Sequence, residues 1–544
     1  MLHPAAGRYH CSLSVTRDNL ASELLDGAVG RGWGDRIALR EGARTLTYHQ
    51  LRDQAARAAS ALRTLRIERG DRVAILMPDT IEAAVALLGV IYHGAVAVPL
   101  SELARTNDIG DLLADSGATA IVVHASLRAG LDGVQGGGLR EVLAVGPRGP
   151  GQRDFVSLVR GAAPVSEAAP VDPDSPALLL YSAGAHGEPE EGAASRRRGV
   201  PHTHATPLRA FESLRSGPVP LGEDDRVLSV VRLWTAYGLG SGLLFPLAAG
   251  AETLLLPEQP HSRAIFAAVD SFRPTALFAT PSVYGQLARD ALAAGRDRPL
   301  AALRICVSGA EDLPPRVTEK VRQVLGADLT VSYGLTEAFQ LVLCGSGSAM
   351  GRPGACGQPA PGFDVRVVND AGEEVGADEI GTLEIRGPTL ASSYWNDTRS
   401  PLRQGWFKTR DRFMVDRDGN YYHCGRADDL FKVGGKWVSP AEVEQALIAH
   451  EAVWECAVIG ADDEDGLIKP LAFVVPNIGH EPGPELERGL REYVKKELAP
   501  YKYPRWIEFL AELPKGPHGK VLRYKLREKV LSSARSRRAE TINI

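Results

Sequence analysis

Residues 406–444 read WFKTRDRFMVDRDGNYYHCGRADDLFKVGGKWVSPAEVE, and together with PKGPHGKVLR at residues 514–523 they decide the fold. The first stretch contains an acidic residue after a turn, Asp411, and then a strand-like NYYHC segment. It continues into Gly-Arg-Ala-Asp-Asp at residues 425–429, a charged joint between two apolar regions. We interpret this joint as the boundary between two folding units.

Hydrophobic periodicity assigns a fold class to each side of the joint. Apolar runs alternate with amphipathic segments from about residue 45 to 340, which predicts parallel sheets covered on both faces. Short strands separated by turn residues follow at about 340–427 and indicate a small antiparallel β-barrel. We therefore predict a multidomain α/β protein, in which residues 1–427 form a large domain with doubly wound sheets and the barrel subdomain. Residues 428–544 are predicted to form a small, mobile α+β domain.

Bulk properties agree with this organisation and exclude several classes of protein. A chain of 544 residues is too long for one ordinary core. The net charge of −5, with acidic and basic residues interspersed, gives no nucleic-acid or membrane footprint. Six scattered cysteines without a CxxC pair indicate reduced structural thiols. No signal peptide or membrane span is recognisable, so we expect a cytoplasmic protein.

The combined motifs resemble the adenylate-forming superfamily of acyl- and aryl-CoA synthetases, luciferases and peptide-synthetase adenylation domains. The resemblance covers nearly the whole chain, from Leu46-Thr47-Tyr48 through residues 70–100 and YGLTEA at 333–338 to Lys520. It implies that a carboxylic acid is activated as an acyl-adenylate and then passed to a thiol. The implied cofactors and substrates are ATP or acyl-AMP, Mg²⁺ if adenylation is active, and CoA.

The resemblance also assigns a nucleotide site. Thr336 is expected to contact the α-phosphate and Glu337 to hold Mg²⁺, because charge builds up on the phosphates as the acid attacks. An ionised Asp411 can accept hydrogen bonds from both ribose hydroxyls at once. Arg426 is expected on the ribose and phosphate side. The residues expected to frame the adenine are Ser308, Gly309, Ala310, Glu311, Ser332, Tyr333 and Gly334, with Tyr333 stacking on the ring.

A swinging C-terminal domain would let one site catalyse two half-reactions in turn. By resemblance Asp428 is the hinge, and Lys520 is the catalytic lysine that bridges the substrate carboxylate and the α-phosphate during adenylation. In the second orientation, the segment Gly434-Gly435-Lys436-Trp437 would line the tunnel for the pantetheine arm of CoA. A side chain at Gly435 would block that tunnel.

The phosphate-binding loop departs from the family pattern. Ser182, Gly184 and Gly187 fit the frame, but hydroxyl positions have become Ala183 and Ala185, and an insertion follows. The usual lysine is replaced by Glu190 or, with the gap placed earlier, by Arg198. Each charge-assisted hydrogen bond is worth ~1.5–3 kcal/mol, so the lost donors predict slow adenylation. The alternative is that residues 196–198, a run of arginines, replace the missing cations.

The acid-binding segment looks most like that of benzoate–CoA ligases. In that group an Ala-Tyr-Gly set walls the aryl pocket, which corresponds here to Ala236, Tyr237 and Gly238. The pattern after YGLTEA often has a histidine near the acid, and here that residue is Gln340. A neutral amide suits a polar or larger acid, so a substituted aryl, fused-ring or terpenoid acid is expected rather than benzoate itself.

Three functions remain open from the sequence. The first is an acyl- or aryl-CoA ligase for which thioester formation is the better supported half-reaction, with preformed acyl-AMP from a separate adenylating partner enzyme as its substrate. The second is a complete ATP-dependent ligase in which Arg198 replaces the loop lysine. The third is a non-catalytic nucleotide-binding homologue. A carrier-protein thiol is an alternative acceptor, although the chain contains no carrier-protein Asp-Ser-Leu segment.

Overall fold

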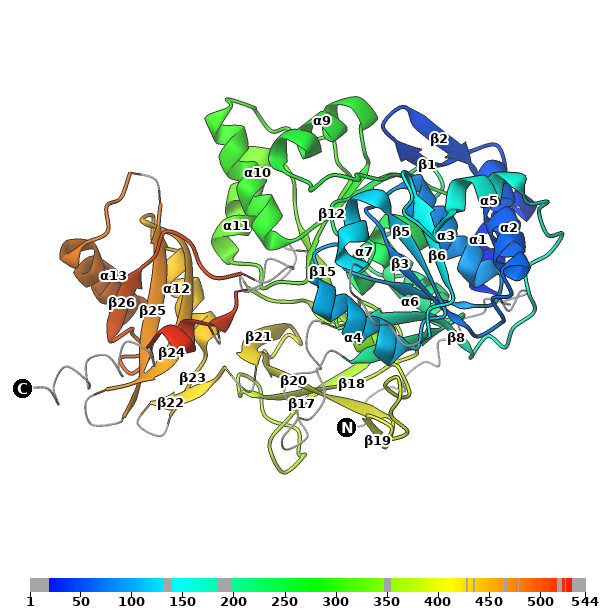
Figure 1. Cartoon of the computed structure of the whole chain (residues 1–544). Coiled ribbons are helices and arrows are strands. Elements are labelled where there is room, and N and C mark those ends of the chain that lie inside the picture. Colours follow the sequence, from blue (N-terminus) through cyan, green and yellow to red (C-terminus); the bar gives the residue numbers. More distant parts are fainter. Residues whose placement is uncertain are drawn as a thin grey trace, which may run out of the picture.

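The computed structural model describes most of the chain. The described residues are 19–131, 138–182, 198–346, 354–426, 429–433, 436–463, 467–477, 479–515, 521–523 and 525–530. Figure 1 shows a large body, which contains the helices and sheets of the N-terminal region, and a smaller lobe built from the C-terminal residues. The predicted class, a multidomain α/β protein with a small α+β C-terminal domain, is confirmed.

Within the described residues, the first sheet has seven strands in the order β7-β6-β5-β3-β4-β8-β9. Neighbouring strands run parallel except for the β8–β9 pair, which is antiparallel. Its strands are β3 (Arg72–Leu76), β4 (Val96–Pro99), β5 (Ala120–His124), β6 (Glu141–Val145), β7 (Arg153–Asp154), β8 (Pro176–Tyr181) and β9 (Gly199–Thr203). Its parallel strands alternate with helices α3 (Ile81–Tyr92), α4 (Thr106–Ser116) and α5 (Phe155–Gly161).

Local sequence explains where the helices of this region begin. Helix α2 (Tyr48–Thr64) starts at a capping box, in which the Thr47 side chain accepts from the Gln50 backbone and the Gln50 side chain accepts from Thr47. Every residue of α3 except Glu82 is buried, so this helix lies inside the domain. Helix α1 (Leu20–Gly30) packs against both α2 and α3.

The second sheet has nine strands among the described residues, in the order β16-β15-β14-β13-β12-β10-β11-β1-β2. Its strands are β1 (Ile37–Glu41), β2 (Arg44–Thr47), β10 (Arg226–Ser229), β11 (Glu252–Leu254), β12 (Ala276–Ala279), β13 (Ile305–Gly309), β14 (Thr330–Tyr333), β15 (Leu343–Ser346) and β16 (Gln358–Pro359). The central strands are parallel, and both ends of the sheet are antiparallel. Its longer helices are α6 (Thr206–Arg215), α9 (Ser262–Phe272) and α10 (Pro281–Ala293), and the shorter ones are α7 (Ala236–Leu239), α8 (Phe245–Ala249) and α11 (Pro315–Lys320).

A third, antiparallel sheet follows in the chain. Its strands are β17 (Asp364–Val368), β18 (Gly381–Arg386), β19 (Leu402–Arg403), β20 (Trp406–Val415) and β21 (Tyr421–Arg426). The predicted barrel subdomain begins at about residue 340, but β15 pairs with β14 and β16 pairs with β15, so both strands belong to the nine-stranded sheet. The antiparallel unit therefore begins at Asp364 and ends at Arg426, within the charged joint.

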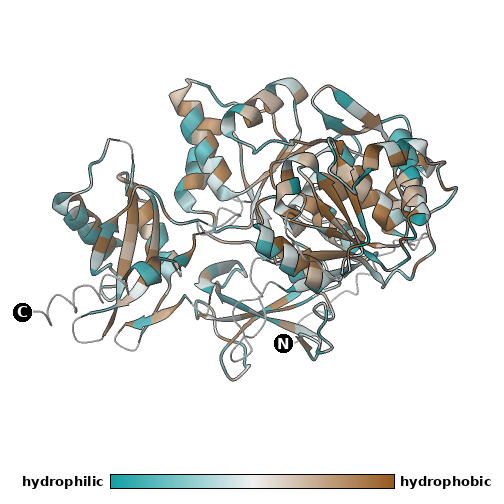
Figure 2. Cartoon of the chain, in the orientation of Figure 1, coloured by the Kyte–Doolittle hydropathy of each residue, from teal (hydrophilic) through white to brown (hydrophobic). Residues whose placement is uncertain are grey.

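The C-terminal lobe has hydrophobic clusters of its own. Figure 2 shows apolar strands inside this lobe and polar helix surface outside. A hairpin of β22 (Phe431–Val433) and β23 (Lys436–Val438) precedes helix α12 (Pro440–Ile448). The three-stranded sheet contains β24 (Val453–Asp462), β25 (Ile468–Pro476) and β26 (Trp506–Phe509), with helix α13 (Pro484–Glu497) between β25 and β26.

Two sets of polar contacts join the lobe to the large body. Arg316 donates to the carbonyl oxygen of Ala449 at 2.8 Å, and the Ser439 hydroxyl donates to the carbonyl oxygen of Cys424 at 2.6 Å. Ser439 also caps α12, as the Ser-Pro pair in the sequence suggests. Among the described residues, no helix is both long and apolar enough to cross a membrane.

Candidate active site

The parallel strands β13 and β14 bring the predicted adenine-framing residues together. Gly309 lies opposite Ser332 in the register of these two strands, so residues 308–311 and 332–334 leave the same edge of the sheet. The carboxyl ends of parallel strands are the usual place for a ligand in such a sheet. Glu311 turns toward helix α10, where it accepts from the Ser282 backbone at 3.2 Å.

Two glycines at this edge are required by close packing. A Cβ on Gly309 would lie 2.6 Å from the Ser332 hydroxyl oxygen. A Cβ on Gly334 would lie 0.9 Å from the carbonyl oxygen of Gln340, which is a direct overlap. The turn from β14 into residues 336–340 can therefore close only with glycine at position 334.

Tyr333 and Asp411 connect the nine-stranded sheet to the antiparallel unit. The Tyr333 hydroxyl donates to Oδ2 of Asp411 at 2.6 Å, and Asp411 is only 4% exposed. In the β20–β21 register Asp411 lies opposite Arg426, so one more predicted site residue lies next to this pair. Burial and the neighbouring Asp411 carboxylate raise the pKa of Tyr333 well above its ordinary value, so Tyr333 is the proton donor of this pair.

His423 and Asp312 complete this network, and neither was predicted as a site residue from the sequence. Nδ1 of His423 lies 2.6 Å from Oδ1 of Asp312, and Nε2 lies 3.9 Å from Oδ1 of Asp411. Burial alone would lower the pKa of His423, but the two carboxylates raise it to about 10. Desolvation would raise the pKa of Asp312, yet attraction to His423 holds it below its ordinary value. The site thus contains an imidazolium between two carboxylates.

This charge state predicts a pH dependence of stability. The pKa of His423 is higher in the folded protein than its ordinary value of 6.5, so its stabilising effect is complete below about pH 6.5 and disappears as pH rises through about 10. We expect the free energy of unfolding to fall across that window by ~1 kcal/mol or more. In His423→Gln the fall should be clearly smaller.

Urea unfolding at several pH values in this window measures the effect. His124→Gln is the matched control, because the Nδ1 atom of His124 contacts the Ser126 hydroxyl at 2.7 Å, outside this network. Equal pH dependence in the wild type and His423→Gln would contradict a charged His423.

Glu337 is buried near the start of the turn that follows strand β14. It is 1% exposed, and its Oε1 accepts from the Tyr394 hydroxyl at 2.9 Å. Thr336 and Glu337 belong to a 3-10 turn, residues Thr336–Ala338, directly after β14. Within the described ranges, no group of three or more His, Cys, Asp or Glu residues could hold a metal ion. A single carboxylate still fits Mg²⁺, which usually binds through one or two carboxylates, water and substrate phosphates.

Arg198 lies next to the predicted phosphate loop, and its side chain packs against the ring of Tyr394. Its guanidinium carbon is 4.9 Å from the centre of the Tyr394 ring, whose hydroxyl contacts Glu337. Its carbonyl oxygen accepts from the backbone of Ser182 at 3.3 Å, and β8 and β9 close the base of the loop. The predicted loop residues Gly184 and Gly187 lie outside the described residues. Tyr394 thus contacts Arg198 through its ring and the Glu337 carboxylate through its hydroxyl.

The predicted acyl-pocket residues lie on or beside one helical segment. Ala236, Tyr237 and Gly238 are buried in α7, and the Tyr237 hydroxyl donates to the carbonyl oxygen of Val307, in the middle of β13, at 3.2 Å. Gln340 approaches the following turn, because a Cβ on Gly240 would lie 2.7 Å from Gln340 Oε1. These residues therefore surround one region beside the adenine-framing strands.

Gln340 has a strained backbone, and the polar atoms of its side chain have no hydrogen-bond partner in the described part of the chain. Its φ is +92°, in the left-handed region, and the preceding residue, Phe339, has a φ of +49°. Its side chain is only 5% exposed, and neither Oε1 nor Nε2 has a hydrogen-bond partner among the described residues. A buried amide without partners is costly, which indicates a ligand group that bonds to it.

The predicted hinge, tunnel and lysine are placed only in part. Asp428, Gly434, Gly435 and Lys520 lie outside the described residues. Lys436 and Trp437 lie on β23, opposite Val433 and Lys432, and Lys436 Nζ is 5.0 Å from the centre of the Tyr501 ring. The tunnel and hinge assignments remain predictions.

Both the sequence and the fold of this chain are similar to those of known proteins. The chain matches the family described as AMP-binding enzyme over residues 28–395 and the AMP-binding enzyme C-terminal domain over residues 442–520. It therefore belongs to the adenylate-forming AMP-binding enzymes, as the motifs predicted.

Particular relatives are named for aromatic acids. A 4-hydroxybenzoate–CoA/benzoate–CoA ligase of Rhodopseudomonas palustris is 36% identical over 94% of this chain and 94% of its own length. The crystal structure of an anthranilate CoA ligase in complex with anthranoyl-AMP has a TM-score of 0.86 at 32% identity, covering 95% of this chain and 98% of that one. A benzoate CoA ligase from Burkholderia xenovorans LB400 has a TM-score of 0.85 at 34% identity, covering 94% and 99%. These names agree with the predicted likeness to benzoate–CoA ligases.

Proposed function

We propose that this protein is an aryl-acid–CoA ligase that forms a CoA thioester through an enzyme-bound acyl-adenylate. The observation that carries the proposal is the convergence of Tyr333, Asp411 and Glu337 at the carboxyl ends of β13 and β14. Full-length relatives named as benzoate and anthranilate CoA ligases support this reaction class. A non-catalytic homologue would have no need of a buried Glu337 carboxylate at this edge.

The residues divide the work of the first half-reaction. Asp411 would accept hydrogen bonds from the ribose hydroxyls, while the hydrogen bond that Tyr333 donates to Asp411 fixes the orientation of the carboxylate. Glu337 would hold Mg²⁺, which when bound offsets negative charge on the phosphates. Thr336 and Lys520 would contact the α-phosphate, and Lys520 would also reach the attacking carboxylate.

We further propose that the enzyme carries out adenylation itself, with Arg198 as a substitute for the missing loop lysine. The supporting contact is the stacking of Arg198 on Tyr394, because the same tyrosine holds Glu337. A guanidinium there would face the phosphates together with the metal ligand. The rival is an enzyme restricted to thioester formation, which the lost hydroxyls at Ala183 and Ala185 favour. That enzyme would depend on a separate adenylating partner.

We propose a substituted aromatic acid as the substrate. The Ala236-Tyr237-Gly238 segment would wall the pocket, and the buried Gln340 amide would be its polar side. An amide offers one acceptor and two donors, so it suits a hydroxyl or amino substituent on the ring. Unsubstituted benzoate would leave the amide without a partner.

Gln340→Leu tests this selectivity. The variant removes the amide at similar volume, so kcat/KM for the best hydroxy- or aminobenzoate should fall about 10–100-fold, which corresponds to ~1.5–3 kcal/mol. Unsubstituted benzoate is the internal control, since its kcat/KM should stay the same or rise. An unchanged ratio of the two substrates would remove Gln340 from the recognition of the ring.

One assay tests the reaction class. Purified protein is incubated with CoA, ATP, Mg²⁺ and a panel of substituted benzoates, and aryl-CoA, AMP and pyrophosphate are quantified. We expect the three products in equal amounts. A second reaction contains CoA and preformed aroyl-AMP without ATP. Thioester in this second reaction alone would support the rival enzyme, and absence of thioester in both reactions would refute the ligase.

A further inference from the structure

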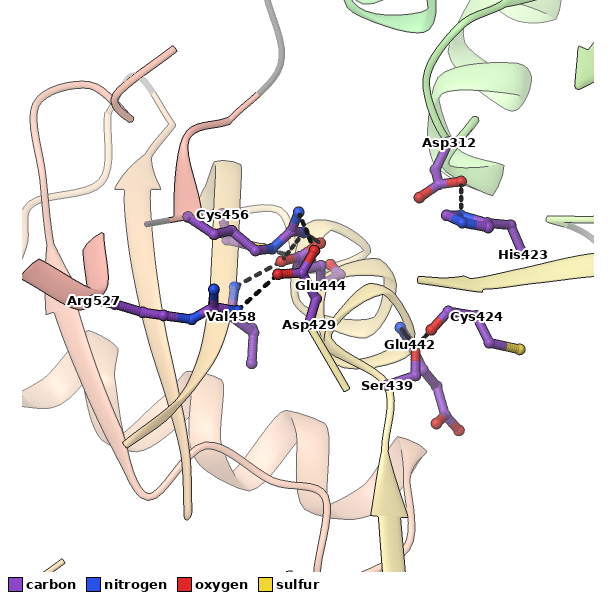
Figure 3. Close-up of polar contacts among 11 residues, drawn as sticks. Asp312, His423, Cys424, Asp429, Ser439, Glu442, Glu444, Cys456, Val458 and Arg527 are labelled. Carbon is purple, nitrogen blue, oxygen red and sulfur yellow. Dashed lines mark hydrogen bonds and ion pairs between the residues drawn. The ribbon is translucent and has the colours of Figure 1, made fainter. Parts of the chain in front are cut away.

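Four charged side chains in the C-terminal lobe form a cluster that connects the predicted hinge to the predicted lysine loop. We call it the hinge clamp: Asp429, Glu444, Arg523 and Arg527. Asp429 directly follows the predicted hinge residue Asp428, and Arg523 lies three residues after Lys520. Figure 3 shows Asp429, Glu444 and Arg527 gathered beside helix α12 and strand β24.

The contacts of the clamp are short and mostly paired. One nitrogen of Arg523, Nη2, lies 2.7 Å from each carboxylate oxygen of Glu444. The other terminal nitrogen, Nη1, lies 3.8 Å from Oδ2 of Asp429. Arg527 Nη2 donates to Oδ1 of Asp429 at 2.7 Å. Two cations thus balance two carboxylates in the clamp.

Glu444 anchors the clamp to the rest of the lobe. Its Oε1 also accepts from the backbone N–H of Val458 in β24 at 2.7 Å. The side chain of Glu444 is 13% exposed and that of Arg523 is 26% exposed, so both are partly shielded from water. Such pairs hold geometry better than exposed surface pairs, which contribute little.

The segment before Arg523 is closed at its base. Lys515 and Val521 form an antiparallel bridge, and the backbone N–H of Leu522 donates to the carbonyl oxygen of Pro514 at 2.7 Å. The residues between them include Lys520. Arg523 therefore joins the chain segment that follows Lys520 to Glu444 and Asp429.

We propose that Arg523 is a positioning residue that fixes the lysine loop relative to the hinge, so that rotation about Asp428 delivers Lys520 to the adenylation site as one rigid unit. This inference rests on the proposed function, because it assigns Lys520 to the first half-reaction. A displacement of about 1 Å from the productive geometry can cost about 100-fold in rate. The second half-reaction does not require Lys520 and should be largely independent of the clamp.

The test measures the two half-reactions separately in Arg523→Gln and in Asp429→Asn. The first is acid-dependent exchange of pyrophosphate into ATP, and the second is thioester formation from preformed aroyl-AMP and CoA. We expect Arg523→Gln to lower the first rate about 10–100-fold and to leave the second within about 3-fold. Asp429→Asn, which keeps the Glu444–Arg523 pair, should act in the same direction with a smaller loss. Arg523→Lys should restore part of the first rate, because it keeps one charge.

Arg491→Gln is the matched control, because it removes another arginine–glutamate pair of the same lobe, Arg491 with Glu487. It should leave both rates unchanged. Equal losses of both rates in Arg523→Gln would show a general structural role and overturn the inference, as would no loss at all. A wild type that carries out only the second reaction would also overturn it, since Lys520 would then have no first reaction to serve. A wild type inactive in both reactions would instead refute the proposed function.

Discussion

Glu337→Gln should lose ATP-dependent aryl-CoA formation by about 10²–10³-fold while keeping thioester formation from preformed aroyl-AMP. The glutamine preserves the size of the side chain and can still accept from Tyr394, which now contacts Oε1 at 2.9 Å. It removes the negative charge that would hold Mg²⁺ against the phosphates, and a loss of that size corresponds to ~3–4 kcal/mol of transition-state stabilisation. The second half-reaction uses neither the metal nor the outer phosphates.

The measurement compares the two rates in the same preparation. Glu141→Gln is a suitable control, because its carboxylate pairs with Arg153 at 2.8 Å in the seven-stranded sheet, outside the predicted site. It should retain ATP-dependent activity within about 3-fold, because exposed ion pairs contribute little. If Glu337→Gln kept full ATP-dependent activity, the assignment of Glu337 to the metal would be wrong.

Gly334→Ala should abolish both half-reactions. The added Cβ would overlap the carbonyl oxygen of Gln340 at 0.9 Å and lie 2.1 Å from its carbonyl carbon, so the turn after β14 would have to open. That turn carries Thr336 and Glu337 and positions Gln340, which already has a left-handed backbone. We expect a loss of stability of more than ~3 kcal/mol, together with a loss of activity.

Gly285→Ala gives the matched control for a glycine-to-alanine change. Gly285 lies inside helix α10, and the nearest atom to its added Cβ, on Val317, would be 3.9 Å away. Alanine is favoured over glycine in a helix by ~0.5–1 kcal/mol, so this variant should be as stable as the wild type or more stable. Thermal unfolding measures both variants. Normal stability and activity of Gly334→Ala would show that the packing of this turn is looser than the structure indicates.

The hydrophobic pattern and the motifs allowed prediction of the fold class, which the structure confirms. Ser308–Glu311 and Ser332–Gly334 lie together at one edge of the sheet, because they follow adjacent parallel strands, and their roles at the nucleotide stay predictions. The extent of the antiparallel unit was harder to predict. Strands β15 and β16 have the same short, turn-bounded pattern as β17, and periodicity does not say which sheet a strand joins.

The ion network around Asp411 could not be predicted from the sequence. His423 and Asp312 are 111 residues apart, and each alone resembles an ordinary surface or strand residue. The strand-like NYYHC segment placed His423 on a strand but gave no sign of its partner. Tyr394 was missed for the same reason, since its contacts with Glu337 and Arg198 come from distant segments.

For the phosphate loop, the sequence pattern and the structure around Arg198 favour different conclusions about ATP binding. Substitution of the hydroxyl positions indicates weaker phosphate binding, whereas the position of Arg198 supports a replacement cation. The choice depends on how a cation reaches the phosphates in three dimensions, which spacing along an inserted segment does not determine. The half-reactions separate these alternatives because only the first one uses the loop.

The most direct test of the account is to mix purified wild-type protein with preformed aroyl-AMP and CoA and to follow aryl-CoA by mass spectrometry. The account predicts rapid formation of the thioester with release of AMP, fastest for a ring that bears a hydroxyl or amino group. If no thioester forms above the rate without protein for any aroyl-AMP offered, the protein is not a ligase of this class.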